Sequence, residues 1–343
     1  MGAVIPVVIV AGFLGSGKTT LLNYLLRNNR GTRIGVVVND FGAVNIDAML
    51  VAGQVDAMVS LGNGCVCCAV DVSELDDLFA QLAQPRSAVD VIVVEASGLA
   101  EPRNLIRMVI ANPNPRITYG GLVEVVDAEQ FAATSTQHPE LVTHLRMADL
   151  VLVNKADRVG AEALADLRAQ LTDCVGQVPV YATTHGRIDP GLLFDDRAPE
   201  QLKTAEQLSF DTLLDDHDHD DPDHRHLHDD YVSVAFTSER ALNPRALVAF
   251  LEDPPSGLFR AKGCVAFAVA GERRKFEVHL VGRHVVVTPG SWARGERRVS
   301  NLVLIGAGLD TVAALKRLHD TVFDGETPLD EQEMLGVWRY ATQ

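Results

Sequence analysis

A glycine-rich segment near the start of the chain has the residue types and spacing of a phosphate-binding loop. The segment runs from Gly12 to Thr19, reads GFLGSGKT and follows the apolar run from Val4 to Val10. Glycines let successive backbone N–H groups point at phosphate oxygens, and the helix expected next presents its positive end to the same charge. Lys18 is expected to reach the β- and γ-phosphates, and the Thr19 hydroxyl to bind Mg²⁺. We therefore predict a nucleoside triphosphate site made by Gly12, Gly15, Ser16, Gly17, Lys18, Thr19 and Thr20.

A second segment indicates that the nucleotide is GTP rather than ATP. Asn154 to Asp157 reads NKAD and follows an apolar run typical of a strand. The Asp157 carboxylate can accept hydrogen bonds from guanine N1–H and from the exocyclic amine, whereas adenine lacks that pair of donors. Lys155 is expected to lie along the base or to brace the phosphate loop, and Asn154 to orient both loops. We therefore expect GTP and GDP to be the ligands.

A third segment places a carboxylate where the γ-phosphate should lie. The apolar run Val91–Val94 ends in Glu95, which we expect to hold a metal-bound water, and Gly98 would let the backbone approach the γ-phosphate. Ras-like enzymes place a water-orienting glutamine after this glycine, but this chain has Leu99 there, so unaided hydrolysis should be slow. Glu101 could position the water instead, although an acid at a helix start is equally explained by the helix dipole.

Three of the five cysteines are packed into one short stretch, as Cys65, Cys67 and Cys68. Thiolates prefer borderline-soft ions such as Zn²⁺ or Co²⁺, and three of them leave a coordination position open, so that the metal can be passed on. We expect Zn²⁺ first and Co²⁺ second. The alternative is a regulatory disulfide between two neighbouring thiols. An odd, clustered set of cysteines does not resemble a disulfide framework, which points to the reducing cytoplasm.

Two further groups of side chains are candidate metal ligands. Asp40 and Asp47 lie between the phosphate loop and the cysteines, in a segment expected to act as a switch, and could approach Mg²⁺ or a second metal. Acidic residues in a loop are also often simply solvated. The acidic stretch 209–230 is too polar to fold and is expected to be a linker. Its histidines either collect divalent ions or only solvate the segment: His217, His219, His224, His226 and His228.

Composition excludes several classes of partner. The chain has 343 residues and a formal net charge of −16, so its surface repels nucleic-acid phosphates, and no basic stripe interleaved with aromatics occurs. Its longest apolar run near the start is too short to span a membrane and lacks the flanks of a signal peptide. We expect a cytoplasmic protein that binds neither nucleic acid nor membrane.

Alternation of β-branched runs with helical patterns predicts an α/β fold of the P-loop NTPase kind, with a mainly parallel sheet flanked by helices. A smaller α+β domain should follow. The expected domains are 1–208, the linker 209–230 and 231–343. The expected strands are 4–10, 33–39, 56–61, 90–95, 121–127, 149–154, 178–183, 231–236, 263–270, 274–280, 284–288 and 300–305. The expected helices are 20–28, 73–84, 100–111, 139–147, 161–172, 244–252 and 310–318.

Taken together, these motifs resemble those of the CobW-type P-loop GTPases, a metallochaperone family that includes the zinc-regulated GTPases. The resemblance rests on 12–20, on GCVCC at 64–68, on EASGLAEP at 95–102 and on 154–157. It covers the first domain closely and the last hundred or so residues loosely. It implies GTP hydrolysis coupled to delivery of a transition metal to a client enzyme or cofactor pathway. The family usually has Glu where this chain has Asp40, which weakens a ligand role for that residue.

The resulting hypothesis is that GTP and Mg²⁺ order the switch around Asp40 and Asp47, tighten the cysteine site, and release the metal on hydrolysis. A metal-responsive regulator or buffer without direct transfer is the alternative. A P-loop kinase of small molecules is disfavoured by the guanine motif. The partner is expected to be a client metalloenzyme or cofactor-synthesis protein, and an apolar strand edge in the last domain could serve a client or a homodimer equally.

Overall fold

The β-branched runs of the first half of the chain form one parallel sheet, as expected for strands buried on both faces. The structure is a computed structural model that describes residues 4–38, 57–60, 72–84, 89–98, 101–194, 231–325 and 329–341. The strand order is β3-β2-β4-β1-β5-β6-β7, and every adjacent pair is parallel. The strands are β1 Ile5–Ala11, β2 Ile34–Val38, β3 Ala57–Ser60, β4 Val91–Glu95, β5 Ile117–Asp127, β6 Leu150–Asn154 and β7 Val180–Ala182.

Helices cover both faces of this sheet because parallel strands need crossover connections. The helices are α1 Lys18–Arg27, α3 Val72–Leu82, α4 Pro102–Ile110, α5 Phe131–Gln137, α6 Glu140–Leu145 and α7 Ala161–Val175, with short 3₁₀ turns at Ala156–Arg158 and Pro190–Leu192. One face packs against α1, and the other packs against α3 and α4. Helices α6 and α7 cover the β5–β7 side.

The second half of the chain forms an antiparallel sheet with helices on one side. Its strand order is β11-β10-β9-β12-β8. The elements are β8 Tyr231–Ser238, α8 Pro244–Glu252, β9 Leu258–Val265, β10 Lys275–Val281, β11 His284–Gly290, β12 Ser300–Ala307, α9 Thr311–His319, a 3₁₀ turn Glu331–Met334 and α10 Leu335–Trp338. Phe236, Phe250, Phe267 and Phe276 anchor its core. None of the helices in the described residues is long and apolar enough to cross a membrane.

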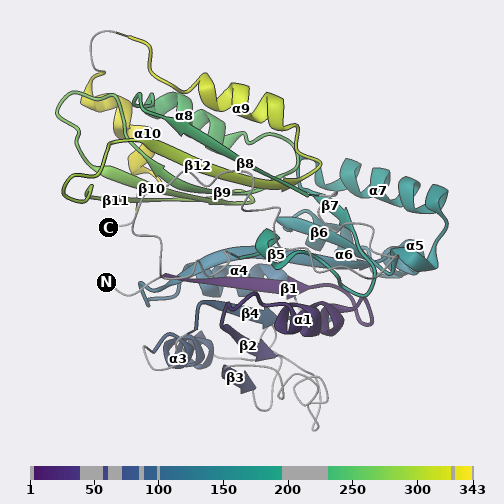
Figure 1. The fold of residues 1–343 in the computed structure, drawn as a ribbon. Helices are drawn as coiled ribbons and strands as arrows, with labels where there is room; N and C mark the ends of the chain where they lie inside the picture. The colour runs from purple at the N-terminus through teal and green to yellow at the C-terminus, as the bar shows by residue number, and fades with distance from the viewer. Residues whose placement is uncertain are drawn as a thin grey trace.

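The C-terminal sheet lies over the first sheet, with α8 and α9 on its outer side (Figure 1). Phe259 and Val281 of the C-terminal sheet belong to the same buried cluster as the core under α1. The contact is possible because β5 carries a β-bulge, seen as a register shift against β1, and the backbone turns at Gly121 with φ 111°. A Cβ atom on Gly121 would lie 2.8 Å from Val281 Cγ1. The two sheets therefore share one core.

A buried carboxyl group, that of Asp149, also stabilises the contact between the two sheets. Asp149 precedes β6 and accepts hydrogen bonds from the Tyr119 hydroxyl at 2.5 Å and from the Leu122 backbone N–H at 2.9 Å. It also accepts one from the backbone N–H of Arg283, in the turn between β10 and β11. Burial raises the pKa of Asp149 to about 6, and these three donors oppose the rise. The turn of the C-terminal sheet is thus held by a side chain of the first domain.

Substituting Gly121 by alanine is expected to lower the free energy of unfolding by about 2–5 kcal/mol, because it adds backbone strain and a clash with Val281. Gly31 is the matched control, since its φ is 80° and a Cβ there would meet nothing within 4 Å. Gly31→Ala should therefore lose only the strain, about 1–3 kcal/mol. Urea denaturation of both variants measures the difference, and equal losses would show that the added methyl group at Gly121 does not clash with Val281.

The fold class predicted from the sequence is confirmed, and most elements lie within a few residues of their expected limits. Three predictions of local structure were wrong. Strand β5 begins at Ile117 rather than at 121, because its bulge lets the strand continue past two glycines. The expected helix 139–147 is shorter, ends at Leu145 and is preceded by the unpredicted α5. The expected strand 263–270 is instead β9, Leu258–Val265.

The shift of β9 has a physical cause. The apolar run after Val265 turns out of the sheet, where Phe267 bridges Leu242 and Val269 bridges Leu329. These bridges bury the run outside the main ladder, so its apolar composition alone indicated the wrong stretch as the strand. The domain limits predicted at 208, 209 and 230 lie outside the described residues.

Candidate functional site

The phosphate-binding segment joins β1 to α1 at the carboxyl edge of the parallel sheet. Strand β1 ends at Ala11, and α1 begins at Lys18 directly after Gly17. Gly17 has φ 103°, a conformation that other residues rarely adopt, and a Cβ there would overlap Asn154 Nδ2. Glycine at this position therefore allows the loop to turn into α1 while touching the tip of β6. Gly12 and Gly15 in the same loop also have positive φ values.

Lys18 lies in the first turn of α1 and is buried beneath the loop. Its Nζ atom donates to the carbonyl oxygen of Gly12 at 3.0 Å and to that of Phe13 at 3.2 Å. The ammonium group is thus held at the mouth of a loop of backbone N–H groups, where a phosphate would bring negative charge. Contact between Lys18 and the phosphates of a nucleotide stays a prediction.

Two side chains far apart in sequence meet at the other end of the loop. Thr19 Oγ1 donates to Glu95 Oε1 at 2.8 Å. Glu95 is the last residue of β4, and β4 is the direct neighbour of β1 in the sheet. Adjacent parallel strands end at the same edge, so the hydroxyl at the start of α1 and the carboxylate at the tip of β4 are brought together. Thr20 follows on α1.

Asn154 connects the phosphate loop to the loop after β7. Its Nδ2 atom donates to the carbonyl oxygen of Ser16 at 2.9 Å, and its Oδ1 atom accepts from the backbone N–H of Gly186 at 2.9 Å. The side chain is 2% exposed and ends β6. Because the Nδ2 and Oδ1 atoms of its side-chain amide each bind a different loop, Asn154 determines the spacing between the two loops.

The other residues of the predicted guanine motif, Lys155 to Asp157, also lie at the carboxyl edge of the parallel sheet. Lys155 has φ 61°, and its Nζ atom donates to Asp127 Oδ2 at 2.6 Å, at the tip of β5. Asp157 lies in the following 3₁₀ turn and is exposed. The backbone N–H of Ala156 donates to the carbonyl oxygen of Thr183 after β7. Asp157 therefore stands at the surface between two loops, with its carboxylate accessible to a ligand.

The residues after β4 approach the phosphate loop from the side of α4. A Cβ on Gly98 would lie 2.7 Å from the backbone nitrogen of Leu14, so the two segments touch. Glu101 is the N-cap residue of α4, makes no side-chain capping hydrogen bond and lies 3.8 Å from Arg103 Nε. Its carboxylate is exposed at the helix start, and its role in positioning water stays a prediction.

Several predicted site residues lie outside the described residues. They are Asp40, Asp47, Cys65, Cys67, Cys68, His217, His219, His224, His226 and His228. The strands that precede the first five are described. Val38 at the end of β2 pairs with Glu95 on one side and with Ser60, the end of β3, on the other. The chain therefore leaves both strands at the edge that carries Thr19 and Glu95.

Within the described residues, no group of three or more His, Cys, Asp or Glu side chains is arranged to hold a metal ion. Cys174 and Cys264 are free thiols, each half-buried, and they lie in different domains. Burial raises the pKa of the Cys264 thiol. Their partial burial and separation are typical of structural cysteines.

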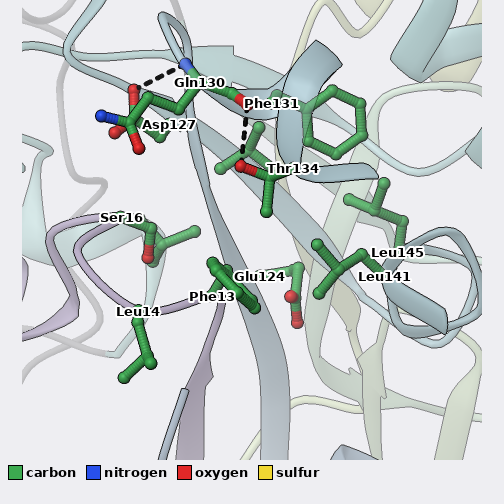
Figure 2. Close-up of a pocket in the computed structure, with 12 residues that line it drawn as sticks. Phe13, Leu14, Ser16, Glu124, Asp127, Gln130, Phe131, Thr134, Leu141 and Leu145 are labelled. Carbon is green, nitrogen blue, oxygen red and sulfur yellow. Dashed lines mark hydrogen bonds between the residues drawn. The ribbon is translucent and has the colours of Figure 1, made fainter. Parts of the chain in front are cut away.

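Two acidic residues of β5 belong to the site but were missed by the sequence reasoning. Asp127 pairs with Lys155 as described above, and Glu124 is buried beside the phosphate loop. Glu124 lines a pocket with Phe13 of the loop and Leu141 of α6 (Figure 2). The sequence contained a feature that could have identified Glu124, because a carboxylate there interrupts the apolar run of a strand that should be buried on both faces.

Two protein-family descriptions match this chain. Residues 6–182 match the family described as CobW/HypB/UreG, nucleotide-binding domain, and residues 231–322 match the cobalamin synthesis protein cobW C-terminal domain. The zinc chaperone CobW of Pseudomonas aeruginosa is 33% identical over 360 residues, covering 92% of this chain and 91% of that protein. The zinc chaperone YjiA of Escherichia coli is 34% identical over 198 residues, covering 56% and 61%.

Among solved structures, the Zn(II)-bound YjiA GTPase from E. coli is similar at a TM-score of 0.44 and 23% identity, covering 94% of this chain and 100% of that chain. The family matches together span both sheets of the present structure. The chain belongs to the CobW/HypB/UreG family of nucleotide-binding proteins and carries the cobW C-terminal domain.

Proposed function

We propose that this chain is a cytoplasmic GTPase that binds a transition metal, Zn²⁺ first and Co²⁺ second, and delivers it to a client protein or cofactor pathway. Relatives named zinc chaperone CobW and zinc-regulated GTPase metalloprotein activator support this reading. We take the GTPase domain to span 1–208, the linker 209–230 and the C-terminal domain 231–343. The linker histidines would raise the local concentration of metal ions.

The observation that carries the proposal is the double hydrogen bond of Asn154. It ties the phosphate loop at Ser16 to the loop at Gly186, so the segment that would bind phosphates and the segments that would bind guanine form one unit. Asp157 stands exposed beside them to accept from guanine N1–H and the exocyclic amine. Lys18 supplies the positive charge under the loop.

The residues present also fit Mg²⁺. Thr19 Oγ1 and Glu95 Oε1 lie 2.8 Å apart, and hydroxyl and carboxylate oxygens are the ligands that this ion prefers. When bound, Mg²⁺ would neutralise charge that develops on the β- and γ-phosphate oxygens. The Glu95 carboxylate would orient a water on that ion, and Thr19 would ligate it directly.

In the proposed reaction, the oxygen of a water molecule bonds to the γ-phosphorus, and the bond from that phosphorus to the oxygen it shares with the β-phosphate breaks. One proton of the water stays on the new phosphate, the other passes to solvent, and GDP and phosphate leave. Lys18 stabilises the charge on the transferred group. Leu99 stands where Ras-like enzymes have a water-orienting glutamine, so turnover without a stimulus should be slow. We propose Glu101 as the residue that positions the water.

The proposed coupling between GTP binding and transition-metal binding rests on where strands β2 and β3 end. Ser60 at the end of β3 lies in register with Val38, which is in register with Glu95. Cys65 follows Ser60 by five residues, and Asp40 follows Val38 by two. The segments with the proposed metal ligands thus start at the edge where the γ-phosphate would lie, and one conformational equilibrium can bias both ligands.

The test is how Zn²⁺ changes both the affinity for GTP and the rate of GTP turnover. Zn²⁺ should change the affinity for GTP in the native chain by about 5- to 150-fold, the usual range of coupling between two sites. The Cys65→Ser, Cys67→Ser, Cys68→Ser variant should lose this response. The matched control is the Cys174→Ser, Cys264→Ser variant, which removes the other two thiols of the chain and should respond as the native chain does.

Phosphate release and nucleotide titrations with and without Zn²⁺ give both quantities. Linkage requires that GTP tighten Zn²⁺ by the same factor by which Zn²⁺ tightens GTP. Equal GTP affinities with and without metal in the native chain would remove the carrier role. Faster Zn²⁺ transfer to an apo client with GTP than with a non-hydrolysable analogue would separate delivery from storage.

A further inference from the structure

Glu124 is a carboxyl group buried directly beside the phosphate loop. The side chain is 3% exposed, and its backbone lies in register with Ala11, the last residue of β1 before the loop. Its Oε2 atom has no hydrogen-bond partner among the described residues. A buried carboxylate without partners is costly, and it either finds a cation or takes up a proton.

The surroundings of Glu124 are mostly apolar. Phe13 of the phosphate loop forms one wall of the pocket, and Leu141 and Leu145 of α6 form another. In Figure 2 the Glu124 side chain lies between Phe13 and Leu141. The Phe13 ring in turn packs against His138 in a tilted arrangement, with 4.7 Å between ring centroids. The wall between Glu124 and the outside is thus made partly by the loop that would bind phosphates.

One cation acts on this carboxyl group across the loop. Burial raises the pKa of Glu124 to about 8, and the charge of Lys18 opposes that rise. Asp127, on the same strand, is already paired with Lys155. From the side of α5 and α6, His138 is hydrogen-bonded to the exposed Glu140.

On α6, burial lowers the pKa of His144, which favours the neutral ring. Lys18 is therefore the cation that matters for Glu124. Lys18 is also the residue that would hold the phosphates of a bound nucleotide. Glu124 and the nucleotide consequently compete for the same positive charge.

We propose that Glu124 takes up a proton from solvent when nucleotide binds to the phosphate loop, so that nucleotide binding and protonation of this side chain are linked. The inference rests on the proposed nucleotide site. Phosphates bring several negative charges to the loop and engage Lys18, and both effects disfavour the Glu124 carboxylate. The protonated carboxylic acid is neutral and can stay in the apolar pocket.

The sign of the linkage follows directly. The pKa of Glu124 is higher in the nucleotide complex than in the free chain, so binding is accompanied by proton uptake at pH values between the pKa of the free chain and that of the complex. Nucleotide affinity must then fall as the pH rises through that range, by at most tenfold per pH unit for one proton. Below the pKa of the free chain the group is protonated in both states, and the affinity does not depend on it.

The experiment counts protons during GDP binding by calorimetry, with the full chain, Mg²⁺, and two buffers of different ionisation enthalpy. At pH 8.5 the native chain should take up more protons than Glu124→Gln by about 0.5 to 0.8 per GDP. The difference between the two proteins is the measure, because thiols also titrate at this pH. Glu140→Gln is the matched control, since Glu140 is exposed on α6 near the same pocket, and it should behave as the native chain does.

A second measurement needs no variant. At pH 7.0 Glu124 is already mostly protonated in the free chain, so its share of the proton uptake should fall to about 0.1 per GDP. Equal proton uptake in the native chain and Glu124→Gln at pH 8.5 would overturn the linkage while GDP binding itself remains intact. Failure of the native chain to bind GDP at all would instead overturn the proposed nucleotide site.

Discussion

Replacing Lys18 by alanine is expected to lower the kcat/KM of GTP hydrolysis by about 100- to 1000-fold, the usual loss when one positioned donor to a developing negative charge is removed. The Lys18 ammonium lies beneath the phosphate loop and donates to the carbonyl oxygens of Gly12 and Phe13. No other side chain of the loop carries a positive charge. Phosphate release at several GTP concentrations measures the effect.

Lys316→Ala is the control for this prediction, because Lys316 is an exposed lysine on α9 of the C-terminal domain. It changes the net charge of the chain by the same amount and should leave turnover unaffected. Circular dichroism of both variants would check that α1 still forms, since Lys18 is its first residue. Turnover in Lys18→Ala within threefold of the native value would contradict a role for this ammonium at the phosphates.

The second large effect concerns stability and pH. Between pH 6 and pH 9 the free energy of unfolding of the native chain should fall by about 2–3 kcal/mol relative to that of Glu124→Gln. Burial raises the pKa of Glu124 in the folded chain to about 8, above its ordinary value of about 4.5 in the unfolded chain. The folded state therefore holds its proton longer, and stability is lost as the pH rises through the folded pKa.

Urea denaturation of both proteins at pH 6 and pH 9 tests this prediction. The quantity that matters is the change of the difference between them, because other groups titrate equally in both. Glu140→Gln, whose side chain is exposed on α6, should follow the native chain at each pH. A difference between native chain and Glu124→Gln that stays constant from pH 6 to pH 9 would mean that Glu124 is not buried as the structure has it.

Local patterns were sufficient to predict the fold and the nucleotide motifs. The run of β-branched residues before Gly12 predicts a buried strand, and the glycines that follow permit a loop that other residues could not form. Similar reasoning located β6 and the guanine motif, because Asn154 to Asp157 follows an apolar run. The apolar run at 263–270 gave a wrong strand prediction, because apolar composition does not show which residues of a run pair with neighbouring strands in the sheet.

What local patterns could not show is which distant side chains meet. Thr19 and Glu95 are 76 residues apart, and only the adjacency of β1 and β4 brings them to 2.8 Å. Asn154 reaches Ser16 across 138 residues for the same kind of reason. Strand order is a property of the whole sheet, because it depends on how each crossover helix packs.

The sequence by itself determined the α/β fold and the phosphate loop, and it predicted the guanine motif, since these depend on residue types at fixed local spacing. Only the tertiary structure shows that Glu124 is buried beside Lys18 and that Gly121 packs directly against Val281 of the C-terminal sheet. The physical reason is that burial and charge proximity arise from elements that pack together from distant parts of the chain. A carboxylate in an apolar strand marks such a place, but only its neighbours in space determine its chemistry.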